Sequence, residues 1–383
     1  MTIASLHRKY STLALIILNF VMFLVLFNLL ISAYLSIHKR VFRANKADNP
    51  IEKKYGSLES LYPKIYPIPS VAEIRDILQE TWRRHYAYEP FTQFREGDYQ
   101  GRYVNVSADG YRNSRNQGPW PPSSEAANIF VFGGSTTFGY GVTDDETIPS
   151  HLQRRLQERF NKPLHIYNFG RGHYYSSQEL ILFQRLISKG FRPDAAIFID
   201  GLNDFFYDSD LPLFTDNLSR HVSKEVKLDF CHENSLPVCR LLRYHSDQTP
   251  QEYVVDPLTV DSVIQMYRNN KQIIEATGRA FAVPTLFVWQ PVPGFKYDLE
   301  YHYFSHGITT NKHKLSGVGY QSVETLFKTG KMGENFVWCA GLQENLTEPL
   351  YLDMVHYTSA MADRVANCIV HGMEQHLANI IEN

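Results

Sequence analysis

The segment NIFVFGGSTTFGYG, residues 128–141, joins a short apolar run to a glycine-rich turn and decides the fold expected for this chain. The run 128–132 has the length and composition of a strand, and residues 148–160 beyond the turn have helical spacing. The same succession recurs, with strand candidates at 164–167, 195–199 and 285–289 and helix candidates at 176–188, 260–277 and 358–377. Short, continuously apolar strands that alternate with helices are typical of a parallel sheet covered on both faces. We therefore predict a three-layer α/β/α domain with a short parallel sheet.

The glycine-rich turn brings a serine to the end of the first predicted strand. The pair Gly133-Gly134 permits a sharp turn that presents Ser135 at the start of the next element. A phosphate loop is the rival interpretation, but it needs Lys and then Ser or Thr after its second glycine, and Gly139 is followed by Tyr140. The dinucleotide pattern GxGxxG does not fit this segment either. A tight turn with a capping serine remains the structural alternative.

Two further polar segments follow the second and third predicted strands. Residues 168–174 read NFGRGHY, and residues 200–204 read DGLND and include Asn203. Ligands of a parallel sheet lie beyond the carboxyl ends of its strands, where both segments would meet Ser135. A backbone N–H from the first segment and the Asn203 amide are donors of the kind that stabilise an oxyanion. Taken alone, residues 168–174 are more commonly explained as a plain strand-to-helix loop, and an ordinary turn is the alternative for residues 200–204.

A fourth segment, Asp353-Met354-Val355-His356, lies just before the last predicted helix. With 15 His among 383 residues, an Asp three residues ahead of a His carries little weight without context. Its place before the closing helix lets it reach the same edge of the sheet. A carboxylate there can hold one N–H of the imidazole and fix the tautomer that takes a proton from a serine.

In this order the four segments resemble the four blocks of the SGNH (GDSL-like) hydrolases, and the resemblance covers residues 126–383. The GGST form of the first block resembles a bacterial subgroup of that superfamily. The resemblance implies a flavodoxin-like α/β fold. It also implies a catalytic triad with Ser135 as nucleophile, His356 as base and Asp353 as the group that orients the imidazole.

The same resemblance implies an oxyanion hole formed by the backbone N–H of Ser135, the backbone N–H of Gly172 and the side-chain amide of Asn203. The second glycine of the family's block falls at His173 in this chain, and Gly172 lies one residue earlier. Either Gly172 or His173 can supply the donor, because a backbone N–H needs no particular side chain. His173 could instead narrow the substrate entrance.

An apolar run occupies residues 13–35, with no charged residue between Lys9 and Lys39. It exceeds the ~20 residues that cross a hydrocarbon core, and no clear small-residue cleavage site follows it. We predict a retained single-pass membrane anchor over residues 1–40 rather than a buried core helix. The excess of basic residues after the run favours a cytoplasmic C-terminal side. A very short N-terminus ahead of one anchor is typical of a signal anchor, and on that ground we expect an extracytoplasmic catalytic domain.

Residues 41–125 are mixed in pattern, and we interpret them as a linker and N-terminal extension ahead of a hydrolase domain at 126–383. Three prolines, Pro63, Pro67 and Pro69, predict an extended stretch, because proline fixes φ and removes a donor. Residues 71–84 have the pattern of a short amphipathic helix.

Charge, histidines and cysteines limit the other possibilities. A formal net charge of −2 gives no electrostatic reason to expect nucleic acid as a partner. His302 and His306 have the spacing of a metal pair on a helix, but Tyr303 stands where a zinc protease has Glu, and we expect neither metal nor cofactor. Cys231 and Cys239 are close enough to form a disulfide if the domain is exported, or they are two free thiols.

Three functions are compatible with these patterns. We expect a serine esterase that works through an acyl-serine intermediate. The 24 Tyr and 24 Phe residues, the anchor and the analogy with relatives favour an O-acetylated carbohydrate as its substrate. An O-acyltransferase of a cell-surface polysaccharide would use the same residues and exclude water. A non-catalytic carbohydrate-binding or assembly protein would keep the fold but has no need of the three triad residues together.

Overall fold

The computed structural model describes residues 3–44, 58–66, 70–157, 159, 163–223, 237, 253–305, 308–309 and 311–376. The chain divides into two compact units, and each is considered by itself. The larger comprises Lys54–Asp216 and Glu252–Asn383 and holds all four segments that carry the resemblance. The smaller comprises Met1–Lys53 and Asn217–Gln251.

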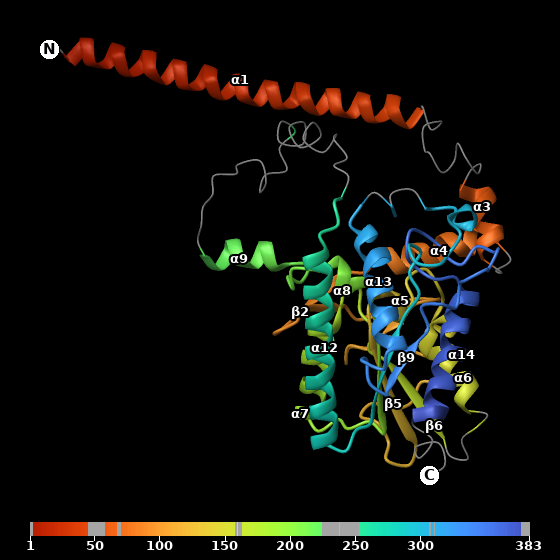
Figure 1. Cartoon of the computed structure of the whole chain (residues 1–383). Coiled ribbons are helices and arrows are strands. Elements are labelled where there is room, and N and C mark those ends of the chain that lie inside the picture. The colour runs from red at the N-terminus through yellow and green to blue at the C-terminus, as the bar shows by residue number, and fades with distance from the viewer. Residues whose placement is uncertain are drawn as a thin grey trace. The chain divides into compact units, whose positions relative to one another are not determined.

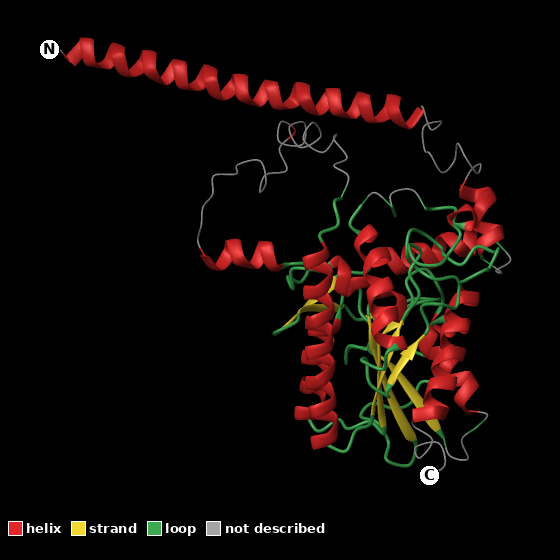
Figure 2. Ribbon diagram, viewed as in Figure 1, coloured by secondary structure: helices red, strands yellow, loops and turns green. Residues whose placement is uncertain are grey.

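A five-stranded parallel sheet forms the centre of the larger unit (Figure 2). Its strands, in spatial order, are β6 (Leu164–Asn168), β5 (Ala127–Gly133), β7 (Ala195–Asp200), β8 (Thr285–Trp289) and β9 (Phe336–Trp338). All neighbouring pairs run parallel. The α/β class is therefore confirmed, and β5 to β8 lie within one residue of their predicted bounds. The sequence did not predict β9, because three residues are too few to show a strand pattern.

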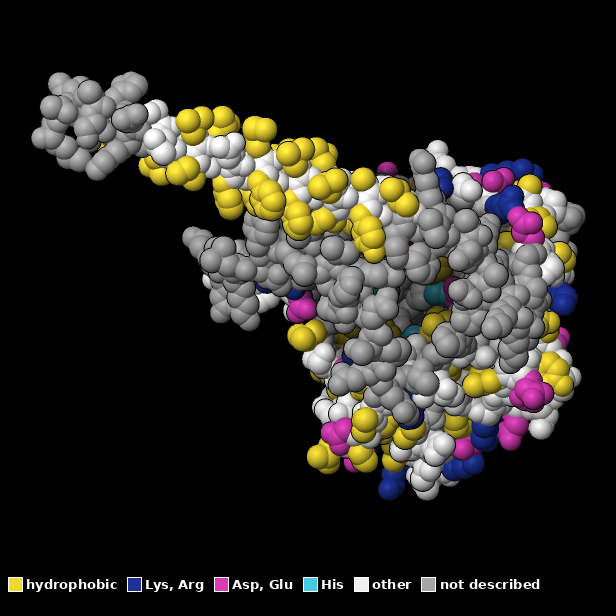
Figure 3. Space-filling model, turned by 90° about the horizontal axis from the view of Figure 1, so that it is seen from above, with side chains coloured by type: hydrophobic (Ala, Val, Ile, Leu, Met, Phe, Trp, Pro, Cys, Tyr) yellow, Lys and Arg dark blue, Asp and Glu magenta, His cyan; other side chains and the backbone are white. Residues whose placement is uncertain are grey.

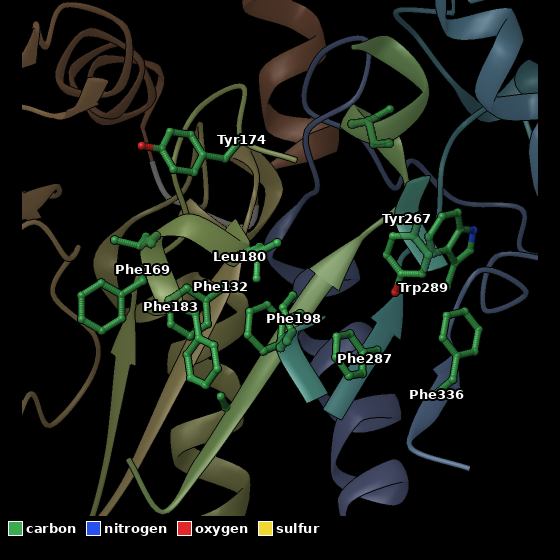
Figure 4. Packing of buried hydrophobic residues seen from close by; sticks show 14 of the residues in the cluster. Phe132, Phe169, Tyr174, Leu180, Phe183, Phe198, Tyr267, Phe287, Trp289 and Phe336 are labelled. Atoms are coloured by element: carbon green, nitrogen blue, oxygen red, sulfur yellow. The ribbon is translucent and has the colours of Figure 1, made fainter. Parts of the chain in front are cut away.

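Alternate side chains of β5 enter two different cores, because successive residues of a strand point to opposite faces. Phe130 and Phe132 point into a core rich in aromatic residues (Figure 4). Ile129 and Val131 point into a core that is mostly aliphatic. All seven residues of β5 are buried, which explains why the strand is apolar without alternation.

Helices cover both faces of the sheet. The aromatic core is closed by α7 (Ser176–Ser188), α12 (Pro257–Ala280) and α13 (His313–Lys328). The aliphatic core is closed by α6 (Ile148–Gln157) and α14 (Ser359–His376). Figure 1 shows α7 and α12 on one side of the sheet and α6 and α14 on the other. The predicted three layers are therefore present. Shorter helical elements are α5 (Ser135–Phe138), η2 (Asp144–Glu146), α8 (Leu202–Phe206), α9 (Thr215–Ser223) and η3 (Leu299–Tyr301).

Residues 54–125 belong to the same compact unit as the sheet. Their elements are α3 (Leu58–Ile65), α4 (Val71–Trp82), the hairpin of β1 (Tyr86–Glu89) with β2 (Gln93–Glu96), and the short pair β3 (Tyr99–Gln100) with β4 (Asn105–Val106). The predicted extended stretch is wrong at Pro63, which lies inside α3, where burial of Leu61 and Ile65 holds the helix in place. Pro67 and Pro69 lie outside the described residues.

Helix α1 (Ile3–Ala44) forms part of the smaller unit. Its stretch Tyr10–Ile37 has a mean hydropathy of 2.8 and is long and apolar enough to cross a membrane. Figure 3 shows hydrophobic side chains (yellow) along it. A signal sequence has the same length and composition, so the retained anchor stays a prediction.

Cys339, just after β9, and Cys368, in α14, form a disulfide. The sequence directed attention to Cys231 and Cys239 instead, and both of these lie outside the described residues. Cys339 and Cys368 are 29 residues apart in the chain and are brought together because α14 packs beside β9.

Candidate active site

Ser135 is the first residue of α5 and follows β5 through Gly133 and Gly134. Gly133 has a φ of +156°, and a Cβ there would lie 2.1 Å from Thr137 Oγ1. A Cβ on Gly134 would lie 2.5 Å from the side-chain nitrogen of Asn203. The turn therefore needs both glycines to approach its neighbours this closely. It leaves Ser135 8% exposed at the carboxyl end of the sheet.

His356 lies between Ser135 and Asp353. Its Nε2 is 2.8 Å from Ser135 Oγ, and its Nδ1 is 2.7 Å from Asp353 Oδ2. An ionised carboxylate only accepts hydrogen bonds, so Nδ1 carries the proton and Nε2 accepts the serine hydroxyl. The other oxygen, Asp353 Oδ1, accepts the backbone N–H groups of Val355 and His356 at 2.9 Å each. Residues 353–356 thus form a turn that the side chain of Asp353 closes, and this turn holds the imidazole of His356 in place.

The carboxyl of Asp353 stays charged to low pH. Burial raises its pKa, but the imidazole of His356 and the hydrogen bonds from His356 and Val355 outweigh burial and lower the pKa to about 2. Asp353 is therefore an anion at neutral pH and can stabilise an imidazolium at His356.

Aromatic rings surround the imidazole of His356. Tyr140 stacks on it, with ring centroids 5.3 Å apart and planes 22° from parallel. Trp82, from α4, contacts the same ring at a steep angle, with centroids 5.5 Å apart, and remains 53% exposed. Figure 3 shows histidine side chains (cyan) in a hollow of the face seen from above. No sequence pattern indicated Trp82 at this site, because it lies 274 residues from His356 in the chain.

The two candidate backbone donors, the N–H groups of Gly172 and His173, differ in whether they are already hydrogen-bonded. The N–H of Gly172 donates to Glu96 Oε1 at 2.9 Å and is therefore engaged. His173 has a φ of +65°, a left-handed conformation that is unusual for a residue other than glycine. It stands where the family has its second glycine, and within the described residues its N–H has no hydrogen-bond partner.

The side chains of His173 and Asn203 are both tied to neighbours. His173 Nδ1 is 2.7 Å from the hydroxyl of Tyr207, and burial, followed by the nearby His356, lowers the pKa of His173. Asn203 Nδ2 donates to the carbonyl of Tyr174 at 2.7 Å. An amide nitrogen carries two protons, so the second remains for another acceptor beside the Ser135 turn.

Gln290 directly follows β8, and its side chain accepts two hydrogen bonds, one of them from the turn at Ser135. Its Oε1 accepts the hydroxyl of Thr136 at 2.6 Å and that of Tyr357 at 3.1 Å. Gln290 is itself buried, next to the residue that follows Ser135.

Both ring nitrogens of His302 form hydrogen bonds with the backbone. Its Nε2 donates to the carbonyl of Met354 at 3.2 Å, and its Nδ1 accepts the N–H of Phe304 at 3.1 Å. Burial lowers its pKa to about 4, so the ring is neutral at pH 7. Within the described residues no group of three or more His, Cys, Asp or Glu side chains could hold a metal ion. His306 lies outside them.

A second grouping of serine, histidine and aspartate lies between α6 and α14. His151 Nε2 is 3.3 Å from Ser359 Oγ, and His151 Nδ1 is 3.4 Å from Asp363 Oδ1. Arg154 Nη2 lies closer to Nδ1, at 2.9 Å, and also contacts Asp363 at 2.9 Å. Arg155 contacts the same carboxylate at 2.6 Å. Sequence reasoning did not single out any of these residues.

Comparison with known proteins finds similar solved structures, all at low sequence identity. No family model matches the chain, and no curated protein matches it. The solved structures that resemble it include the lipase Lip_vut3 from a goat rumen metagenome, at 11% identity over 64% of this chain and 97% of that one, with a TM-score of 0.39. The lipase/acylhydrolase from Enterococcus faecalis matches at 12% identity over 65% and 95%, with a TM-score of 0.36. A member of the lipolytic protein G-D-S-L family from Veillonella parvula matches at 8% identity over 64% and 97%, with a TM-score of 0.36.

Proposed function

We propose that this chain is an SGNH-type serine esterase in which Ser135 forms an acyl-serine intermediate. The observation that carries the proposal is the continuous series of hydrogen bonds from Asp353 through His356 to Ser135, at 2.7 and 2.8 Å. The carboxylate at one end of this series favours the imidazole tautomer with its proton on Nδ1, which is the tautomer that can take the serine proton on Nε2. A protein that only binds carbohydrate has no need of this series.

The reaction would proceed in two steps. Ser135 Oγ bonds to the ester carbonyl carbon while His356 Nε2 takes the hydroxyl proton, and collapse of the tetrahedral intermediate breaks the bond to the alcohol, which leaves with that proton. Water then gives a proton to His356 and attacks the acyl group. The second collapse returns the proton to Ser135 Oγ and releases the carboxylic acid.

The oxyanion of both tetrahedral intermediates needs preorganised donors. We assign the N–H of Ser135, the second side-chain proton of Asn203 and the N–H of His173. We choose His173 over Gly172 because the Gly172 N–H is held by Glu96. The left-handed φ of His173 is also the conformation that a glycine at this place would adopt without strain.

An acylated carbohydrate is the substrate that we favour. Trp82 presents a half-exposed indole beside His356, and an aromatic face of this kind pairs with the apolar face of a sugar ring. An O-acyltransferase would differ only in the second step, where a hydroxyl of the acceptor replaces water. Analysis of the products with and without an acceptor sugar distinguishes the two.

We also propose that α1 anchors the chain and that the catalytic unit is extracytoplasmic. The disulfide between Cys339 and Cys368 supports that side, because structural disulfides persist mainly in oxidising compartments. A reporter fused after Asn383 should be active only outside the cytoplasm, and a cytoplasmic signal would contradict this location.

The test of the function is labelling of the detergent-solubilised full chain by a fluorophosphonate probe. We expect the wild type to be labelled, and Ser135→Ala and His356→Ala to lose labelling. Ser359→Ala serves as the matched control, because it removes the serine of the other grouping, and it should be labelled like the wild type. A folded wild type that is not labelled would contradict an activated serine.

A further inference from the structure

Glu96, the last residue of β2, is a buried carboxylate that the mechanism above does not use. It is 3% exposed. Its Oε1 accepts the N–H of Gly172 at 2.9 Å and the hydroxyl of Tyr140 at 2.8 Å. Its Oε2 is 3.2 Å from Arg84 Nη2, whose side chain is equally buried. All of its hydrogen bonds are therefore charge-assisted, and such bonds are stronger than those between neutral groups.

Both groups bound by Oε1 border the catalytic machinery. Tyr140 stacks on the imidazole of His356. Gly172 immediately precedes His173, whose N–H we assign to the oxyanion hole. The contact is close, because a Cβ on Gly172 would lie 2.4 Å from the Tyr140 hydroxyl and 2.9 Å from that of Tyr86. We call residues 168–174 the oxyanion loop. The carboxylate of Glu96 thus connects this loop to the ring of Tyr140, which packs on His356.

The rest of the β1–β2 hairpin contacts the end of this loop and the start of α7. The carbonyl of Phe94 accepts the hydroxyl of Tyr174, and the carbonyl of Thr92 accepts the side-chain amide of Gln178 at 2.8 Å. The hairpin therefore binds the segment that follows His173 along its length. Residues of the N-terminal extension contribute to the candidate site and do not merely connect it to the anchor.

We propose that Glu96 is a positioning residue that fixes the oxyanion loop, an inference that rests on the proposed esterase function. With the Gly172 N–H held by the carboxylate, the next peptide is fixed in the strained left-handed turn at His173 and offers its N–H to the oxyanion. Without that bond the turn would relax and the donor would move. Displacement of a catalytic group by about 1 Å is enough to cost about 10²-fold in rate.

The alternative is that Glu96 only neutralises Arg84, and two conservative variants separate the alternatives. Glu96→Asp keeps the charge for Arg84 but withdraws the carboxylate by about one bond length, ~1.5 Å, from Gly172. Glu96→Gln keeps the reach and an acceptor oxygen for Gly172 and Tyr140 but loses the charge. If Glu96 positions the loop, an active variant must keep the length of the side chain. If Glu96 only neutralises Arg84, an active variant must keep the negative charge.

The experiment compares kcat and KM for p-nitrophenyl acetate, and the labelling rate with the fluorophosphonate probe, in the full chain. We expect Glu96→Asp to lower kcat about 10²-fold with little change in KM, and Glu96→Gln to stay within about threefold of the wild type. Glu89→Asp and Glu89→Gln are the matched controls. Glu89 lies in the same hairpin but forms ion pairs with Arg95 and with Arg185 of α7, and among the described residues the Gly172 N–H donates to Glu96 instead. Both controls should keep wild-type kcat.

The inference is overturned if Glu96→Gln loses as much kcat as Glu96→Asp or more, or if both keep wild-type kcat. If Glu96→Asp does not fold, as judged by its thermal unfolding, Glu96→Gln decides alone, because it keeps kcat only when reach is what matters. A wild type that neither cleaves the ester nor reacts with the probe contradicts the proposed function instead.

Discussion

Two groupings of serine, histidine and aspartate occur among the described residues, and the hydrogen bonds of their imidazoles run in opposite directions. In the first, Nδ1 of His356 faces the carboxylate of Asp353, an acceptor. In the second, Nδ1 of His151 faces the guanidinium of Arg154, which can only donate. His151 therefore carries its proton on Nε2 and donates it to Ser359, so that it cannot take a proton from that serine.

The comparison teaches that composition and distance do not define a catalytic triad. In both groupings the serine and the aspartate each lie within 3.4 Å of the imidazole. What separates them is the charge of the group that faces Nδ1 of the imidazole, which is a carboxylate in the first and a guanidinium in the second. That group selects the tautomer. The first grouping also lies at the carboxyl edge of the sheet, whereas the second lies between two helices that cover it.

The largest difference between the two groupings should appear when each histidine is replaced. We expect His356→Gln to lower kcat for p-nitrophenyl acetate by at least about 10³-fold, because the serine loses its base. His151→Gln should leave kcat within about twofold of the wild type. Steady-state kinetics of both variants provide the measurement, and an equal loss in the two would contradict the assignment of the site.

Replacing each aspartate by asparagine should give a smaller but still clear contrast. In Asp353→Asn, an amide N–H can face Nδ1 of His356 and impose the tautomer that Arg154 imposes on His151, so we expect kcat to fall by about 10²-fold or more. Asp363→Asn removes partners from Arg154 and Arg155 on a partly exposed surface, and it should change thermal stability slightly and kcat hardly at all. Unchanged kcat in Asp353→Asn would show that the carboxylate does not orient the base.

The smallest effect concerns the stability of the fold at acid pH. Burial, together with the charges of Arg154 and Arg155, lowers the pKa of His151 from 6.5 to about 4. The unfolded chain therefore binds up to one more proton at this site between pH 6.5 and 4, and stability is lost as the pH falls through that window. The pKa of Asp353, lowered from 3.8 to about 2, acts only below it, since its contribution is lost as the pH falls from 3.8 towards 2.

The check is urea unfolding of the wild type and of His151→Gln at several values between pH 4 and 7.5. We expect the variant to lose less stability on acidification, by up to about 1.4 kcal/mol per pH unit within the window. Arg154→Met should have a weaker effect in the same direction, since it removes one of the charges that lower the pKa of His151. Identical pH dependence in the wild type and His151→Gln would contradict the lowered pKa.

Much of the sheet could be predicted because buried parallel strands are apolar on both sides. The run at 128–132 and the helix at 176–188 need only local sequence to be identified. The strand β9 is too short for a pattern, and α13 contains Gly317 and Gly319, which weaken helix propensity. The disulfide between Cys339 and Cys368 depends on the packing of α14 beside β9, which no local pattern records.

The sequence predicted the three residues of the site that carry the recognisable segments, Ser135, Asp353 and His356, and their side chains do meet. It could not predict Glu96, because its contact with Gly172 joins residues 76 apart through a hairpin that has no motif. It also could not decide between Gly172 and His173, since that choice depends on which N–H is already engaged. Local pattern thus identified the three residues of the candidate triad, and tertiary packing decided which other residues contact them.

Ser135 and His356 are 221 residues apart in the chain, and this separation has a consequence for the order in which they are synthesised. Ser135 is synthesised well before His356, which is held by a turn just before α14. A growing or prematurely terminated chain that ends before His356 would carry the serine without any group to activate it. If the proposed function holds, Ser135 therefore acquires its base only once His356 has been added, 221 residues later.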